Sequence, residues 1–345
     1  MDAVLTCMVD EKIGPGELCK RLVQTAAEFL GAEAAFALRS PAIALKYALD
    51  ALQIEKGAKI AISALAPSWH YYALVQNGFV PLVIDVRQED AQLPTDALCD
   101  AVRLGAKAVL LFEALGFMPN MTELVERVSV PIIEDISQSA GAEYTGKKSG
   151  SFGTFSIMGM EEKDRITAGG GALLFTCQKR NSAPLKSALA LSGNHACDLL
   201  PDINAALALT QIKEFAKNEE RRRELHELFL KSLFSTRHKT FTHTSVTVDS
   251  ATGAGDGGDA GNTNAIYGMS VILESGFKDA RIYALKKEVE IELAFSDSVA
   301  SLKAEELDGC ENAKSLALRT VFFPLYPRLS GAQAAQVCKV ISTLP

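Results

Sequence analysis

Residues 131–175 read PIIEDISQSAGAEYTGKKSGSFGTFSIMGMEEKDRITAGGGALLF, and this stretch decides the predicted fold. It opens with a short apolar run rich in β-branched residues, which predicts a buried strand. Two acids, Glu134 and Asp135, follow at the carboxyl end of that strand. Open α/β sheets bind their ligands at the carboxyl ends of parallel strands. Because a buried carboxylate without a partner is costly, Asp135 predicts a cation or a hydrogen-bond donor beside it.

Lys163 follows Asp135 across a glycine-rich turn and stands shortly before the glycines 169–171. A lysine amine can hold an aldehyde cofactor as a Schiff base, and an ionised carboxylate can keep a pyridine nitrogen protonated. We therefore expect pyridoxal phosphate to bind between these two side chains. The residues alone leave an alternative open, in which Asp135 caps a helix that begins near Ile136 and Lys163 is a solvated loop lysine.

Short apolar runs alternate with helical periodicity in the first part of the chain, which predicts βαβ units and a mostly parallel, buried sheet. The expected strands are 59–62, 80–86, 108–112, 131–133 and 172–176, and the expected helices are 17–30, 42–52 and 185–192. Later, strand-like spacing at 266–274 is followed by helical patterns at 278–289 and 331–342. The predicted fold class is α/β, with a large domain over 1–225 and a small α+β domain over 226–345.

Composition favours a self-sufficient core and argues against several kinds of partner. The 345 residues are 48% hydrophobic and carry a formal net charge of -7 with no long basic run. Nucleic acid and anionic membranes are therefore not expected as partners. Seven cysteines without CxxC spacing indicate reduced thiols and no metal site. We find neither a signal-peptide pattern nor a membrane-spanning run, and expect a cytoplasmic protein.

Two segments resemble the DegT/StrS family of sugar aminotransferases. Residues 134–153, EDISQSAGAEYTGKKSGSFG, are similar to the family pattern EDxxQxxGAxYxGKxxGxxG. Residues 201–225, PDINAALALTQIKEFAKNEERRREL, resemble a family helix that packs at the subunit interface. The resemblance covers nearly the whole chain. It implies a type I aminotransferase fold with a three-layer large domain, pyridoxal phosphate as the cofactor and a homodimer.

The resemblance also implies an activity and a set of site residues. The activity is transfer of an amino group from an amino acid, such as glutamate, to a keto sugar that is nucleotide-linked. Lys163 forms the Schiff base, Asp135 pairs with the pyridine nitrogen and Gln138 lies beside the phenolic oxygen of the ring. The cofactor-binding candidates are Asp135, Gln138, Ser40, Pro41, Ala42, Trp69 and Asn194, with Lys163 as the catalytic residue.

Five of these assignments, Ser40, Pro41, Ala42, Trp69 and Asn194, come from segments that match the family less closely. The phosphate is expected at the N-terminus of the helix that follows Ser40. There the family carries SGTAAL, whereas Pro41 removes an amide donor and Ala42 a hydroxyl. Trp69 is the candidate for stacking on the ring, and packing of its helix against the sheet is the alternative. The family also has an asparagine that the partner subunit contributes to the site. Cys197 aligns with this asparagine without a gap, and Asn194 aligns with it if a local gap is allowed.

The departures leave two further functions open. Met158 stands where the family has a serine that binds the phosphate, so the phosphate site differs at three positions when Pro41 and Ala42 are counted. A catalytically degenerate relative that acts as a binding or regulatory protein is one alternative. The other is a pyridoxal phosphate-dependent sugar dehydratase, although relatives of that kind have an altered lysine region and Lys163 is present here.

Overall fold

The computed structural model describes the chain except residues 1, 192–194, 243–261, 275 and 304–306. Its larger part is built on a seven-stranded sheet with strand order β1-β9-β8-β5-β4-β2-β3. Strands β3, β2, β4, β5 and β8 pair in parallel, whereas β9 pairs antiparallel with both β8 and β1. The strands are β1 (Ala34–Leu38), β2 (Lys59–Ser63), β3 (Val80–Ile84), β4 (Ala106–Phe112), β5 (Ile132–Asp135), β8 (Phe155–Gly159) and β9 (Ala172–Thr176).

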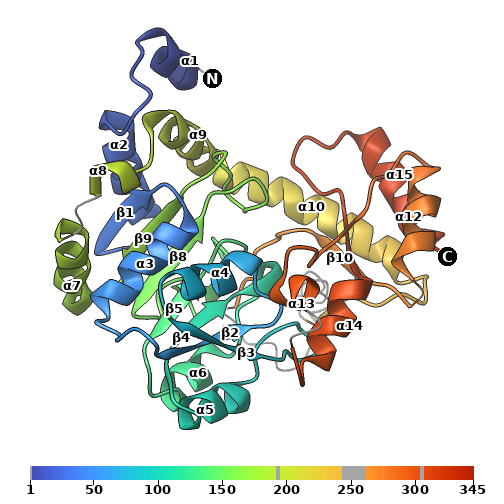
Figure 1. The fold of residues 1–345 in the computed structure, drawn as a ribbon. Coiled ribbons are helices and arrows are strands. Elements are labelled where there is room, and N and C mark those ends of the chain that lie inside the picture. Colours follow the sequence, from blue (N-terminus) through green and yellow to red (C-terminus); the bar gives the residue numbers. More distant parts are fainter. Residues whose placement is uncertain (1, 192–194, 243–261, 275, 304–306) are drawn as a thin grey trace.

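Helices cover both faces of this sheet, so the larger part has three layers (Figure 1). Successive side chains of a strand point to opposite faces, and the core is divided accordingly. On β2, Ile60 and Ile62 pack in one hydrophobic cluster, whereas Ala61 packs in another. Helices α3 (Pro41–Ala51), α4 (Ser68–Gln76) and α7 (Lys179–Ala190) cover the first face; α2 (Glu17–Leu30), α5 (Thr95–Arg103), α6 (Met121–Arg127) and α9 (Asp202–Lys213) cover the second.

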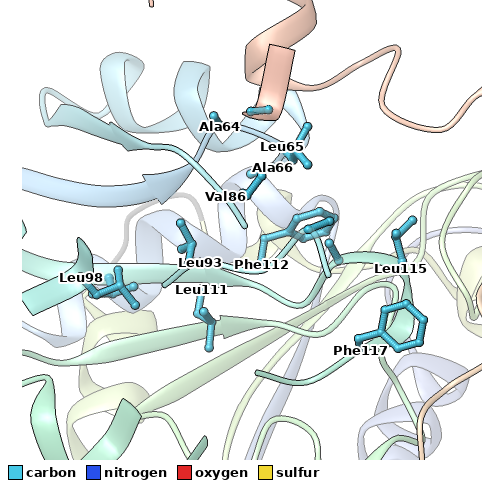
Figure 2. Close-up of a cluster of buried hydrophobic side chains, with 14 of the residues drawn as sticks. Ala64, Leu65, Ala66, Val86, Leu93, Leu98, Leu111, Phe112, Leu115 and Phe117 are labelled. Atoms are coloured by element: carbon cyan, nitrogen blue, oxygen red, sulfur yellow. The ribbon is translucent and has the colours of Figure 1, made fainter. Parts of the chain in front are cut away.

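The cluster shown in Figure 2 fills the second face beneath β2 and β4. Leu98 of α5 packs there with Leu111, and Phe117 closes the cluster on the far side. Burial of such side chains stabilises the sheet by about 1.5 to 3 kcal/mol each. Leu65 and Phe112 belong to this cluster and also line the pocket described below. The core therefore fixes the floor of the pocket directly.

The smaller part is a three-stranded antiparallel sheet with helices packed around it. Its strand order is β10-β12-β11, with β10 (Met269–Ile272), β11 (Glu292–Leu293) and β12 (Thr320–Phe323). The helices are α12 (Phe277–Leu285), α13 (Val299–Leu302), α14 (Glu311–Arg319) and α15 (Gly331–Ser342). Thus the predicted fold class, a mostly parallel sheet followed by a small α+β unit, is confirmed.

One long helix, α10 (Phe215–Leu233), connects the two parts (Figure 1). Leu225, Phe229 and Leu230 of this helix are buried in one cluster with Val271 of β10. The helix runs without a break past residue 225. The division into domains 1–225 and 226–345 stays a prediction.

The segment expected to be a single helix from Asp202 to Leu225 forms two, α9 and α10, which meet at Glu214. The break at Glu214 lets α9 lie along α2 while α10 turns towards α15. Asp202 fixes this arrangement, because its carboxylate accepts hydrogen bonds from the backbone amides of Gly16 (2.9 Å) and Cys19 (2.8 Å) at the start of α2. An acid at that end also complements the helix dipole.

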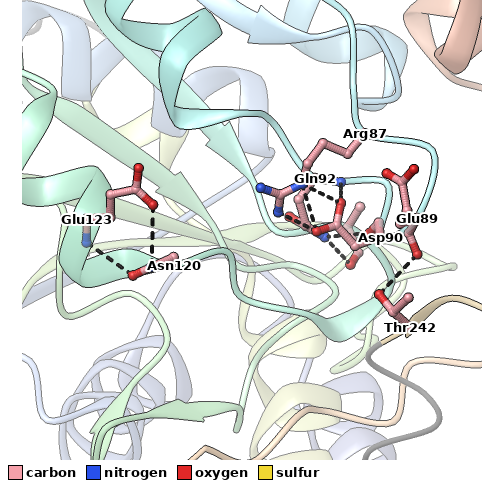
Figure 3. Close-up of polar contacts among 8 residues, drawn as sticks. Arg87, Glu89, Asp90, Gln92, Asn120, Glu123 and Thr242 are labelled. Carbon is pink, nitrogen blue, oxygen red and sulfur yellow. Dashed lines mark hydrogen bonds and ion pairs between the residues drawn. The ribbon is translucent and has the colours of Figure 1, made fainter.

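Polar contacts tie the loop after β3 to the loop before α6 (Figure 3). Asp90 accepts a hydrogen bond from the backbone amide of Gln92 at 3.0 Å. The Gln92 side chain donates in turn to the carbonyl of the first residue in η1 (Ala114–Gly116), at 3.1 Å. Leu115 has a left-handed backbone (φ 61°), and its amide donates to Gln138 Oε1 at 2.7 Å. This chain of bonds positions Gln138.

Short elements complete the described structure. They are α1 (Asp2–Val9), α8 (His195–Asp198) and the two-residue strands β6 (Glu143–Tyr144) and β7 (Lys147–Lys148), which pair antiparallel. The seven cysteines are all free thiols. Among the residues that the structure describes, we find no helix of the length and apolarity that crossing a membrane requires.

Candidate active site

A cavity of about 610 Å³ lies between the large sheet and the three-stranded sheet. One side is lined by residues that end or follow β2, β4, β5 and β8, and the other by residues of β11 and β12. It thus lies outside the carboxyl ends of parallel strands, where such sheets bind ligands. Its lining mixes aromatic and aliphatic side chains with several charged ones, as expected of a small-molecule site.

Lys163 lines this pocket at an exposed position. Its Nζ atom lies 2.7 Å from Glu292 Oε2, and the Lys163 side chain is 65% exposed. The Tyr267 hydroxyl donates to the carbonyl oxygen of Lys163 at 2.6 Å. Burial raises the pKa of Tyr267, so this phenol remains a donor at neutral pH. The loop after β8 is thereby fastened to β11 and to the segment before β10.

Trp69 and Gln138 line the same pocket as Lys163. Trp69 stands in the first turn of α4 and packs edge-on against the imidazole of His70, with ring centroids 4.2 Å apart. Gln138 follows β5 and is held by its bond to the Leu115 amide. Three of the predicted site residues are therefore brought together around one cavity.

Asp135 ends β5, as predicted, and its side chain is completely buried. Its Oδ1 accepts from the Ser137 amide at 3.0 Å and from the Ser137 hydroxyl, and its Oδ2 lies 2.7 Å from His70 Nε2. The donor expected beside this acid is thus present, and it is a histidine. Asp135 is absent from the described residues that line the pocket. In that part of the structure a turn follows Asp135, without a helix at Ile136.

Two further buried acids lie beside Asp135. The Glu134 carboxylate accepts from the backbone amides of Gly150 (3.0 Å), Phe152 (2.9 Å) and Gly153. Glu113 accepts from the Ser139 hydroxyl. Burial and the neighbouring Glu134 raise the pKa of Glu113 well above its ordinary value. Burial raises the pKa of Glu134 as well, while its bonds from the backbone amides act in the opposite direction.

Asp164 follows Lys163 in the chain and is half-buried, whereas the lysine is exposed. Its Oδ2 atom accepts from the Glu161 amide at 2.7 Å. A Cβ atom on Gly159 would lie 2.3 Å from Asp164 Oδ2 and 2.8 Å from the Ser137 hydroxyl, so glycine leaves the room that these side chains occupy. Burial raises the pKa of Asp164 to about 7, and the nearby charges of Asp135 and Glu161 add to the effect.

The residues expected at the phosphate form the start of α3. The Ser40 hydroxyl accepts from the Ile43 amide at 3.3 Å, so it serves as the N-cap of the helix. Pro41 is buried at the first helical position and Ala42 is half-buried. Of the described residues that line the pocket, none comes from this helix start.

The remaining predicted positions lie elsewhere. Asn194 falls outside the described residues. Met158 is fully buried in the cluster with Ile136 and Leu173 and packs as a core residue. Cys197 is exposed, and its carbonyl accepts from Arg39.

Several residues that line the pocket or lie behind it are not predicted from the sequence. They are His70, Asp164, Arg165, Arg222, Tyr267 and Glu292. Asp164 and Arg165 are direct neighbours of Lys163, so their position in the chain was a usable signal. Nothing in the sequence pairs His70 with Asp135, because that contact depends on how β2 and β5 lie in the sheet.

The three-layer sheet with a lysine-lined pocket at the carboxyl ends of its strands defines an aminotransferase fold of type I. The sequence profile of the DegT/DnrJ/EryC1/StrS aminotransferase family matches residues 1–342. The chain belongs to this family, and the predicted resemblance is confirmed. Family members are pyridoxal phosphate-dependent aminotransferases, in agreement with the predicted enzyme class and cofactor.

Individual relatives are distant. The chain is 32% identical over 168 residues to EpsN of Bacillus subtilis, which is named as a putative pyridoxal phosphate-dependent aminotransferase. This match covers 46% of this chain and 43% of EpsN. It is 25% identical over 259 residues to a UDP-4-amino-4,6-dideoxy-N-acetyl-beta-L-altrosamine transaminase of Campylobacter jejuni, covering 69% of this chain and 67% of that protein. The match to EpsN thus spans less than half of that relative's length.

Solved structures share the fold over the whole chain. An aminotransferase of this family from Brucella abortus superposes with a TM-score of 0.83 at 18% identity, covering 99% of this chain and 93% of that one. The PLP form of Spr1654 from Streptococcus pneumoniae gives a TM-score of 0.83 at 16% identity, covering 99% and 96%. At these identities the likeness establishes the fold.

The pocket suits some parts of pyridoxal phosphate better than others. An amine, an indole and an amide are gathered on one cavity in Lys163, Trp69 and Gln138, which suits a ring that carries an aldehyde and a phenolic oxygen. Asp135 is sealed behind His70, so a ring nitrogen reaches it only if a covering side chain moves. The start of α3, where the phosphate is expected, lacks the amide of Pro41, uses the Ile43 amide for the Ser40 cap and contributes none of the described residues that line this pocket.

Proposed function

We propose that this chain is a pyridoxal phosphate-dependent aminotransferase that moves an amino group from an amino acid, glutamate in the first place, to a keto sugar. The observation that carries the proposal is the meeting of Lys163, Trp69 and Gln138 on one cavity at the carboxyl ends of the strands. Membership of the family supports it. The bound cofactor supplies an electron sink for the carbon that loses or gains the amino group.

The roles of the residues follow from their chemistry. The Lys163 amine holds the cofactor aldehyde and carries a proton to and from the substrate carbon, which requires release from Glu292. Trp69 packs on one face of the ring and Gln138 donates through its amide nitrogen to the phenolic oxygen. Asp135 is proposed to pair with the ring nitrogen, and the start of α3 at Ser40, Pro41 and Ala42 to receive the phosphate. Asn194 is proposed to act across a homodimer interface.

The acceptor is proposed to be a nucleotide-linked keto sugar. The Campylobacter relative is named for an amino sugar carried on UDP, and this supports the same substrate class here. The cavity has a volume of about 610 Å³, which leaves room for a ligand with several parts. A cytoplasmic homodimer without nucleic-acid or membrane partners completes the proposal.

A second function is favoured by one observation. Both oxygens of Asp135 are bonded within the protein, and His70 covers the carboxylate with no exposure of either side chain. A family member that kept the fold and the pocket but only bound a ligand, without catalysing a reaction, would not need a free carboxylate at Asp135. We therefore retain a catalytically degenerate binding or regulatory protein as the alternative.

One experiment separates these functions. Purified protein is incubated with pyridoxal phosphate, reduced with borohydride and digested, and the peptide that carries the cofactor is identified by mass spectrometry. We expect the label on Lys163, loss of the label in Lys163→Ala, and an unchanged label in Lys186→Ala, an exposed lysine of α7. Glutamate should then convert the cofactor to its amine form, seen as a change in the absorption spectrum. A wild-type protein that takes up no label favours the binding protein.

A further inference from the structure

The amine of Lys163 is bonded to an acid from the other part of the chain. Its Nζ atom lies 2.7 Å from Oε2 of Glu292, which stands on β11, 129 positions further along. Lys163 itself lies in the loop after β8 of the large sheet. Both side chains line the cavity, so the ion pair joins its two walls.

The ionisable side chains around this pair are acidic as a whole. The acids that line the cavity are Glu161, Glu162, Asp164, Glu292 and Asp297, and the cations are Lys163, Arg165 and Arg222. One of the cations, Arg165, is already paired with Glu219 of α10. Of the five acids, Glu292 is the one that pairs with Lys163 within the described part of the chain. Removal of Glu292 should therefore free the amine more than removal of any other acid in the cavity.

The pair opposes the chemistry that an amine performs on an aldehyde. The nitrogen attacks through its lone pair, so it must be unprotonated and free. As an ammonium bonded to Glu292, Lys163 offers no lone pair. Capture of an aldehyde forms a carbon–nitrogen double bond, and it releases one water molecule and the extra proton of the ammonium. The bonds to Glu292 and to an aldehyde carbon therefore exclude each other.

The two parts of the chain are also fastened by bonds that do not involve the lysine side chain. The backbone amides of Val299 and Ala300 donate to the carbonyls of Ala66 and Ala64, at 2.9 and 2.7 Å. All four residues are buried. Loss of the ion pair should therefore leave the two parts together and the chain folded.

We propose that Glu292 is a latch on Lys163: it holds the amine as an ammonium in the cofactor-free protein and so limits the rate at which the cofactor is captured. This assignment rests on the proposed aminotransferase function, in which Lys163 carries the cofactor. Both partners are more than half exposed, and an exposed pair is weak, so the latch slows capture without preventing it. Salt screens such a pair and should release the latch.

Competitive acetylation of the cofactor-free chain tests the latch directly. Trace acetic anhydride reacts with unprotonated amines, and mass spectrometry gives the yield on Lys163 relative to Lys186, an exposed lysine of α7. We expect this ratio to rise about threefold in Glu292→Gln, as the strength of an exposed pair allows. Glu290→Gln is the matched control and should leave the ratio unchanged, since Glu290 is exposed and is absent from the described residues that line the cavity.

The rate of cofactor capture is the second measurement. Pyridoxal phosphate is added to the wild type and to both variants, samples are reduced with borohydride over time, and the label on Lys163 is measured. We expect capture about threefold faster in Glu292→Gln than in the wild type or in Glu290→Gln. In about 1 M KCl the difference should disappear.

Either of two results would overturn the latch: an acetylation ratio for Lys163 that is the same in Glu292→Gln and the wild type, or capture that is no faster in this variant. If circular dichroism shows that Glu292→Gln does not fold, acetylation of the wild type with and without salt decides, because an unchanged ratio in about 1 M KCl also excludes the latch. Failure of the proposed function looks different. In that case no variant carries the cofactor on Lys163, while acetylation still reports whether Glu292 restrains the amine.

Discussion

The layer behind the pocket and the wall of the pocket hold their charged side chains in opposite ways. Behind the pocket lies what we term the sealed layer, His70, Glu113, Glu134 and Asp135, in which each side chain is completely buried. On the wall, Lys163 and Glu292 are 65% and 55% exposed and pair with each other across two parts of the chain. The acid predicted to serve the cofactor is built into the interior, whereas the predicted amine is open to solvent and ligands.

This difference has an energetic consequence. An exposed ion pair contributes at most about 1 kcal/mol to stability, since water solvates both partners when they separate. A buried carboxylate that loses its donors costs several kcal/mol, because no water replaces them. Substitutions in the sealed layer should therefore affect folding first, and substitutions on the wall should affect ligands first.

Glu134→Ala should have the largest effect on folding. It removes the acceptor of three backbone amides at Gly150, Phe152 and Gly153, all in the loop between β7 and β8. We expect the free energy of unfolding to fall by about 4 kcal/mol or more, at about 1 to 3 kcal/mol for each unpaired group. Urea denaturation followed by circular dichroism measures this loss.

Glu134→Gln is the matched control for that variant. Its amide oxygen still accepts hydrogen bonds, so it should lose clearly less stability than the alanine variant. If the two variants lose equally, the three amides do not depend on the side-chain oxygen, and the sealed layer is held in another way.

His70→Ala should have the next largest effect. Without the imidazole, Asp135 Oδ2 loses its donor while the carboxylate stays buried, and we expect a loss of about 3 kcal/mol. In an Asp135→Asn background the same substitution should cost less, because a neutral amide is cheaper to leave without a donor. Denaturation of the four proteins in this cycle gives the coupling energy. A coupling near zero would contradict the pairing of His70 with Asp135.

Most of the large sheet could be predicted because its signals are local, although β1 and β8 are not among the expected strands. The helix over 17–30, the strand over 172–176 and the helix over 331–342 coincide with α2, β9 and α15. The strand expected over 266–274 is shorter in the structure, Met269–Ile272. Each element follows from apolar spacing that a strand or helix needs to bury one face. The break at Glu214 could not be predicted, since it reflects packing of α9 on α2 and α10 on α15.

The site could be predicted only in part. Asp135 at a strand end and Lys163 in the following loop are local features, and the structure has both. The partners of these residues are 65 and 129 positions away in the chain, His70 and Glu292 respectively. Such pairs depend on which strands and parts lie side by side. Burial depends on the same long-range packing, because nothing local makes Asp164 half-buried while Lys163 is exposed.

Asp164 should show the smallest of these effects, and only above about pH 4. Its pKa rises from 3.8 to about 7 on folding, so between these values the folded chain binds more protons than the unfolded one. The contribution of Asp164 to the free energy of unfolding is therefore fully present below about pH 4. It decreases as the pH rises and is lost once the pH has passed about 7. Asp164→Asn cannot ionise, and its amide oxygen can still accept from Glu161. We expect the variant to exceed the wild type by about 0.8 kcal/mol at pH 5 and by about 2 kcal/mol at pH 8, half of what the full titration between the two pKa values would give at about 1.4 kcal/mol per pH unit, since the side chain keeps some exposure.

Urea denaturation at both pH values measures the difference, with Asp297→Asn as the control because this carboxylate lines the same pocket but is exposed. A gain of stability in Asp164→Asn that is the same at pH 5 and pH 8 would show that ionisation of Asp164 is not its cause. A gain that is small at pH 5 and larger at pH 8 would place Asp164 with the sealed layer rather than with the solvent-exposed wall. The boundary between the two regions would then run between Lys163 and Asp164, two neighbours in the chain that differ in burial.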